Sequence, residues 1–301
     1  MRFNQRARLD TSQVNDRRGR GGAVAVGGGG LGLLGILLVV VLNALGGGDG
    51  TSLPTSGLPA GAPVSGGQVE QSCRTGADAN QRQDCRMVAV VNSVQDHWES
   101  EFARRGWDYA VADTNIFEGS VRTGCGAATS AVGPFYCPAD QQVYLDLGFF
   151  SDLVTRFGAS GGDFAEAYVI AHEYGHHVQN LLGISGRAQR AAQQEGPTGA
   201  SVRLELQADC FAGVWAGRAT TTVDQDELPL FEELTATDIR EGLDAAAAVG
   251  DDRIQERSQG RTDPESWTHG SAEQRQHWFQ TGFRAGTPDA CDTFAADAPI
   301  D

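Results

Sequence analysis

The segment 171–177, Ala-His-Glu-Tyr-Gly-His-His, most constrains what this chain can fold into, because it contains the pattern His-Glu-x-x-His. Residues four apart lie on one face of an α-helix, about 6 Å apart along its axis. A helix here therefore lets His172 and His176 bind one zinc ion, each at about 2.0–2.1 Å. Glu173 lies beside that face and can act as a general base toward water on the metal. The motif requires a helix and indicates a zinc hydrolase.

The surrounding periodicity predicts which elements carry this motif. A helix is expected from Phe164, after an N-cap in the run Ser160–Asp163, to Gly183. Apolar alternation predicts one clear strand, Gln142–Leu147. The fold class expected is α+β, a mostly helical domain with a small sheet. Further helical patterns fall at 86–106, 148–157, 201–219, 235–248 and 271–284, and the last includes Trp278, Phe279 and Phe283 as expected core.

A catalytic zinc needs a third protein ligand besides the two histidines. The metzincin pattern would place glycine and histidine three and six residues after His176, but Gln179 and Leu182 stand there. A downstream helix offers Glu205 and Asp209, which are one turn apart and share a face. We expect Glu205 to bind the metal and Asp209 to accept the second N–H of a zinc-bound imidazole. The alternatives are that Asp209 replaces Glu205 as ligand, or that both are surface acids.

Two neighbours within the motif have other expected roles. His177 lies about 100° around the helix from His176, so we expect it to pack rather than to bind the metal. Gly175 costs roughly 1 kcal/mol in a helix interior. Its missing side chain predicts the close approach of another element, and we expect the neighbouring strand. The run 184–200 is expected to be a mobile connection between the two ligand-bearing helices.

Charge divides the chain into a basic start and an acidic remainder. Among 301 residues with a net charge of −16, six arginines fall in the first 20 positions. Residues 21–45 are uncharged, and 25 helical residues span roughly 37 Å, enough to cross a bilayer. The sequence therefore predicts a basic cytoplasmic arm (1–20), an uncleaved transmembrane signal-anchor (21–45), a Gly/Pro/Ser-rich linker (46–70) and an acidic extracytoplasmic domain (71–301). A cleaved signal peptide is the alternative. Such an acidic domain is a poor partner for nucleic acid.

The cysteine count agrees with export to an oxidising compartment. Six cysteines occur, and no pair has the C-x-x-C spacing of a zinc ribbon or redox motif. Six cysteines allow 15 pairings. Nearest neighbours favour Cys73–Cys85 and Cys125–Cys137, which leaves Cys210–Cys291 to tie the C-terminus to the core.

Several longer stretches resemble the family of "putative neutral zinc metallopeptidases", membrane-anchored bacterial proteins whose active-site pattern is similar to that of gluzincins. The resemblance covers the basic arm, the anchor and nearly all of 71–301. It implies a zincin-like fold with the roles assigned above. The stretches are Cys125-Gly126, GPFYCP (133–138), VYLDL (143–147), YVIAHEYGHHVQNLLG (168–183), RLELQADCFAGVW (203–215), THGS (268–271) and QRQHWFQTGF from Gln274.

The function expected is a single-zinc endopeptidase that hydrolyses proteins or peptides outside the cytoplasm. Zinc-bound water is activated by Glu173, which later delivers its proton to the leaving amine. His269 is a candidate second donor to the oxyanion, with Tyr174 and Tyr136 as weaker candidates. In zincin folds an edge strand binds extended peptide, a role expected for Val143–Leu147. The alternative is a non-catalytic, metal-stabilised peptide-binding or scaffold protein of the cell envelope.

Overall fold

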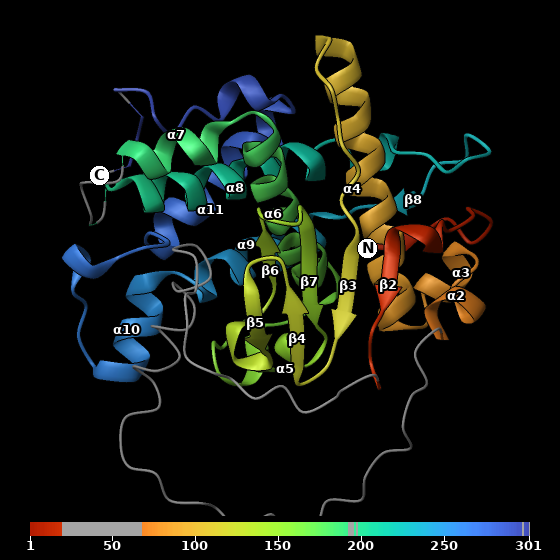
Figure 1. The fold of residues 1–301 in the computed structure, drawn as a ribbon, viewed down its shortest axis with the longest axis horizontal. Coiled ribbons are helices and arrows are strands. Elements are labelled where there is room, and N and C mark those ends of the chain that lie inside the picture. Colours follow the sequence, from red (N-terminus) through yellow and green to blue (C-terminus); the bar gives the residue numbers. More distant parts are fainter. Residues whose placement is uncertain (20–67, 192–195, 197, 297, 301) are drawn as a thin grey trace, which may run out of the picture.

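In the computed structural model, which describes residues 1–19, 68–191, 196, 198–296 and 298–300, a mixed four-stranded sheet supports the site (Figure 1). Its strand order is β2 (Val14–Asp16), β3 (Thr114–Phe117), β7 (Gln142–Asp146) and β6 (Phe135–Cys137). The first three are parallel, whereas β6 pairs antiparallel with β7. The expected strand at 142–147 is therefore interior, and β6 forms the edge nearest the metal-binding motif.

The two faces of the sheet are covered by different elements. On one face Ile116, Val143 and Leu145 join the main core with the helices. On the other, Phe117 and Tyr144 join a smaller core beneath the hairpin of β4 (Ser120–Thr123) and β5 (Gly126–Thr129). Alternate residues of β3 and β7 thus face opposite cores, as the two-residue period of a strand requires.

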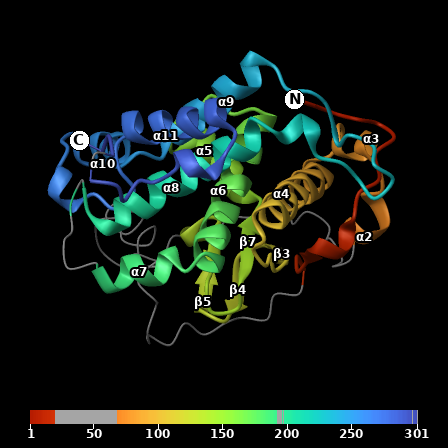
Figure 2. The same cartoon turned by 90° about the horizontal axis from the view of Figure 1, so that it is seen from above.

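Helix α6 (Asp163–Leu181) lies at the centre of the helical part (Figures 1 and 2). It contacts β6 and β7 as well as α4 (Gln83–Arg105), α8 (Ala200–Ala216) and α9 (Ala236–Ala248). Helix α11 (Ala272–Ala285) packs closely on α8, since a Cβ at Gly282 would lie 1.9 Å from the Cys210 carbonyl oxygen. The remaining helices and strands are α2 (Gln68–Ser72), α3 (Gly76–Ala79), α5 (Gly148–Thr155), α7 (Ile184–Ala191), α10 (Asp251–Gln259), β1 (Arg2–Phe3) and β8 (Phe231–Glu233).

These elements confirm the α+β class, with helices predominating. Two predictions about them were incomplete. The connection expected over 184–200 contains the helix α7, while residues 192–195 and 197 lie outside the described part. The strands β2, β3 and β6 were not predicted, because strands of three or four residues give no measurable alternation.

The N-terminal segment contradicts the prediction of a separate arm over residues 1–20. Residues 1–19 belong to the same folded unit as the domain: β1 pairs with β8, and β2 adds a parallel strand to β3. The Asn80 side chain makes two 2.9 Å hydrogen bonds with the backbone of Phe3, which is itself buried. The location of the arm and of the domain relative to a membrane stays a prediction.

Ion pairs reinforce the attachment of this segment. Arg18 lies 2.8 Å from Asp16 and 3.1 Å from Asp84, and Arg82 lies 2.9 Å from Asp84. Burial opposes ionisation of Asp84, but Arg82 and Arg18 outweigh it and hold its pKa below the usual value. Four charges from residues 16–18 and 82–84 therefore neutralise one another where the two segments meet.

The predicted anchor, residues 21–45, and most of the predicted linker, 46–67, lie outside the described residues. Within the part of the chain that is described, no helix combines the length and the apolar character that a membrane span requires.

The three predicted disulfides are all present: Cys73–Cys85, Cys125–Cys137 and Cys210–Cys291. The first joins the start of the domain to α4. The second closes the β4–β5 hairpin onto β6, beside the site. The third joins α8 to the C-terminal segment.

Candidate metal centre

His172, His176 and Glu205 converge on one point, as the sequence predicts. The two histidines lie on α6 and the glutamate on α8, and their ligand atoms all fall within 4.8 Å of one another. Glu205 Oε2 lies 3.1 Å from His172 Nε2, and Oε1 lies 3.4 Å from His176 Nε2. Two donors bound tetrahedrally at 2.0–2.1 Å are about 3.3 Å apart. This donor set and spacing fit zinc.

Asp209 lies behind His172, in the predicted role. Its carboxylate accepts a 2.9 Å hydrogen bond from His172 Nδ1, which leaves Nε2 facing Glu205. Burial lowers the basicity of His172, but Asp209 and Glu205 outweigh it and raise its pKa to about 10 in the metal-free chain. The geometry decides between the two carboxylates: Glu205 faces the ligand nitrogens of both histidines, and Asp209 faces the opposite nitrogen of one.

Arg275, on α11, completes the group and was not predicted. Its guanidinium donates to both oxygens of Asp209, at 2.8 and 3.0 Å, and to the Tyr168 hydroxyl at 3.1 Å. Asp209 is fully buried, and burial opposes its ionisation, but Arg275 and His172 hold its pKa below the usual value. Arg275 therefore supplies the counter-charge that keeps Asp209 ionised as a hydrogen-bond acceptor.

Glu173 is buried between the ligands and the edge strand. Burial raises the pKa of its carboxyl group, while the nearby His172 and His176 oppose that rise. The backbone N–H of Tyr136, on β6, donates to the carboxylate. A carboxylate with a raised pKa, held beside the ligands by a backbone donor, is suited to act as a general base.

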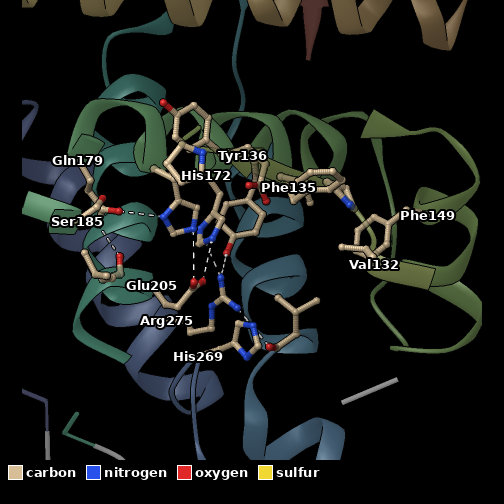
Figure 3. Close-up of a pocket in the computed structure, with 18 of the residues that line it drawn as sticks. Val132, Phe135, Tyr136, Phe149, His172, Gln179, Ser185, Glu205, His269 and Arg275 are labelled. Atoms are coloured by element: carbon tan, nitrogen blue, oxygen red, sulfur yellow. Dashed lines mark hydrogen bonds and ion pairs between the residues drawn. The ribbon is translucent and has the colours of Figure 1, made fainter. Parts of the chain in front are cut away.

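His269 lies in the same pocket (Figure 3), and Asp251 holds it there. Asp251, the first residue of α10, is 3.1 Å from His269 Nδ1 and accepts backbone N–H groups from residues 268–270. Burial lowers the pKa of His269, but Asp251 outweighs it and raises the pKa above its ordinary value. Asp251 therefore makes this imidazole easier to protonate than a histidine in water. Asp251 was not predicted, since nothing in the sequence pairs it with His269.

Three further predictions concern His177, Tyr136 and Tyr174. His177 packs as expected, 2.6 Å from the Ala110 carbonyl and 3.1 Å from the Tyr136 hydroxyl, and burial lowers its pKa to about 4. The Tyr136 hydroxyl is thereby occupied away from the ligands. Tyr174 bonds Thr114 and the Ala112 carbonyl beneath the sheet, so it is no candidate oxyanion donor.

Gly175 faces a helix, where a strand was expected. A Cβ at this position would lie 2.9 Å from both Cα and the carbonyl oxygen of Ala208. Ala208 lies next to Asp209 on α8, so the missing side chain lets the two ligand-bearing helices approach each other.

One wall of the pocket is apolar. Figure 3 shows Val132, Phe135 and Phe149 together at one side of the metal-site residues. Further apolar lining residues are Pro134, Pro138, Val169, Leu204, Val249 and Ile254.

Comparison with known proteins agrees with this geometry. A family model described as "Putative neutral zinc metallopeptidase" matches residues 1–294. An uncharacterized protein of Mycobacterium tuberculosis (strain H37Rv) is 57% identical over 225 residues, which cover 74% of this chain and 75% of that protein. The uncharacterized protein YpfJ of Escherichia coli K12 is 44% identical over 296 residues, covering 95% and 97%. No solved structure matches. The chain belongs to the "putative neutral zinc metallopeptidase" family.

Proposed function

We propose that this protein is a zinc endopeptidase that cleaves peptide bonds of extended protein or peptide segments. The observation that carries the proposal is the convergence of His172, His176 and Glu205 with the buried Glu173 beside them. A purely structural metal site has no use for a buried fourth side chain that can accept a proton. When bound, zinc supplies Lewis acidity toward the scissile carbonyl and toward water.

Side chains of the protein transfer the protons, stabilise the developing negative charge and orient a metal ligand. Glu173 takes a proton from the attacking water and later gives it to the leaving amine. His269, whose pKa is raised by Asp251, donates from Nε2 to the oxygen that becomes negative. Asp209 and Arg275 hold the His172 ring in its metal-binding tautomer.

The edge strand β6 supports binding of an extended substrate. Within the described residues no further strand pairs with its outer edge, where the Tyr136 N–H donates to Glu173. A peptide could add there as a further strand, beside Glu173. The apolar wall that includes Phe135 and Phe149 favours a bulky apolar side chain next to the scissile bond.

An oxidising compartment is the proposed location, in line with the three disulfides. Membrane attachment through residues 21–45 stays a prediction. Alkylation of the chain from its native source, with and without prior reduction, tests the location: we expect six thiols to react only after reduction. Reaction of all six without reduction would contradict it.

The activity is tested with zinc-loaded wild type and Glu173→Gln on a peptide library, with new termini identified by mass spectrometry. The substitution keeps the shape and leaves the ligands untouched. We expect cleavage by wild type and a loss of roughly 100-fold or more in the variant. Equal cleavage by both, or none by either with zinc bound, would overturn the proposal. Peptide binding without cleavage would support the non-catalytic alternative.

A further inference from the structure

The second histidine ligand has a different partner from the first. His176 Nδ1 lies 2.9 Å from Gln179 Oε1, one turn further along α6. An amide oxygen can only accept, so the proton sits on Nδ1, and Nε2 keeps its lone pair for the metal. Gln179 thus does for His176, with a neutral amide, what Asp209 does for His172 with a carboxylate. In Figure 3, Gln179 lies on the opposite side of the site from Phe149.

The same amide reaches across to the helix that carries the third ligand. Gln179 Nε2 donates to the Leu204 carbonyl at 2.7 Å and to Gln207 Oε1 at 3.2 Å. Leu204 directly precedes Glu205. Both acceptors fix which end of the Gln179 amide carries nitrogen, and therefore which end faces His176.

Gln207 continues the series to the C-terminal segment. Its Nε2 donates to the Cys291 carbonyl at 2.8 Å, and Cys291 is joined by a disulfide to Cys210, on α8. Gln179 and Gln207 are both buried, so water does not replace a lost partner without cost. Every donor in the series points the same way, from His176 through two amides to a backbone carbonyl.

We infer that Gln179 and Gln207 are positioning residues for the metal ligand His176. The Cys210–Cys291 disulfide fixes the far end of this series of hydrogen bonds, which we call the relay. The inference rests on the proposed zinc site. The disulfide keeps the Cys291 carbonyl over Gln207, Gln207 keeps the Gln179 amide in one orientation, and that orientation sets the His176 tautomer. Loss of such outer hydrogen bonds typically weakens metal binding 10- to 100-fold.

The test measures the zinc dissociation constant of the metal-free full chain by competition with a chromophoric chelator. We expect Gln179→Leu to bind zinc 10- to 100-fold more weakly than wild type, and Gln207→Leu about tenfold more weakly. Removing the disulfide with C210A/C291A should also weaken binding, whereas C73A/C85A should not. Gln95→Leu is the matched control, because Gln95 is an equally buried glutamine on α4 whose partners are Gln13, the Tyr109 hydroxyl and the Ala112 N–H.

The possible outcomes separate the inference from the proposed function. Unchanged zinc affinity in folded Gln179→Leu and Gln207→Leu would overturn the inference, as would an equal loss in Gln95→Leu. Circular dichroism establishes that each variant is folded, and if one relay variant fails to fold, the other decides. Failure of wild type to bind zinc would instead overturn the proposed function.

Discussion

Replacing Gly175 with alanine tests how closely the two ligand-bearing helices must pack. The added Cβ would lie 2.9 Å from Cα and the carbonyl oxygen of Ala208, whereas carbon atoms rest about 3.5 Å or more apart. Helix α8 would therefore have to retreat by about 0.6 Å. Metal–ligand distances tolerate only about 0.2 Å. The displacement exceeds what the site between His172, His176 and Glu205 can absorb.

Two opposing effects set the stability of Gly175→Ala. Alanine favours the helix by about 1 kcal/mol relative to glycine, and overpacking costs about 1–3 kcal/mol. The net loss expected is about 1 kcal/mol, which lowers the melting temperature by about 2–4 °C for a domain of this size. Calorimetry of the metal-free chain measures this loss, and chelator competition measures the accompanying fall in zinc affinity.

Gly186→Ala on α7 is the matched control for Gly175→Ala. A Cβ at Gly186 would have one neighbour within 4 Å, the tip of the Arg190 side chain at 3.5 Å. Only the helix preference then remains, so this variant should be as stable as wild type or more stable, with unchanged zinc affinity. If Gly175→Ala behaved like Gly186→Ala in both measurements, the close packing of α6 on α8 would be refuted.

Four more predictions concern protonation, charge and attachment. The pKa of His172 is about 10 without metal, and the pKa of His176 is also raised, so zinc must displace at least one proton below pH 10. Calorimetric zinc affinity should therefore rise at least tenfold per pH unit from 6 to 8, and a flat profile would contradict this. Arg275→Met should lower the free energy of unfolding in urea by about 3–5 kcal/mol, because it leaves the buried carboxylate of Asp209 without its counter-charge. Adding Asp209→Asn should recover part of this loss, and no recovery would count against the ion pair. His269→Ala should lower kcat roughly 100-fold or more with zinc affinity unchanged, and an unaltered kcat would exclude the donor role. Amides of residues 14–17 should exchange as slowly as those of β3, and exchange at unfolded-peptide rates would restore the separate arm.

The sequence predicted the part of the site whose geometry is local. His172, Glu173 and His176 share one helix, so the helical period alone relates them. Glu205 and Asp209 share a second helix, so the helical period relates them too. Only the approach of α8 to α6 could not be read from these two periods. The disulfide pairing was equally accessible, because two of its three loops are short.

What could not be predicted depends on contacts distant in sequence. Arg275 lies 66 positions from Asp209, and Asp251 lies 18 from His269, and neither distance is a helical or strand period. The segment that begins at Gln274 carries the family resemblance, which was the one available signal for Arg275. The packing of residues 1–19 on the domain could not be predicted for another reason. Six arginines before an uncharged run are typical of a cytoplasmic flank, and this pattern indicates no contact with the domain.

The groups behind the two imidazoles together set the charge of the site. Asp209 is negative, but Arg275 cancels it through two hydrogen bonds. Gln179, behind His176, is neutral. Glu205 is therefore the one uncompensated anion among the ligands and their immediate partners, and a bound zinc would keep a net charge of about +1. A second carboxylate in place of Gln179, or the loss of Arg275, would remove that charge and with it part of the Lewis acidity that hydrolysis needs. An amide on one histidine and a neutralised carboxylate on the other hold both rings without that cost.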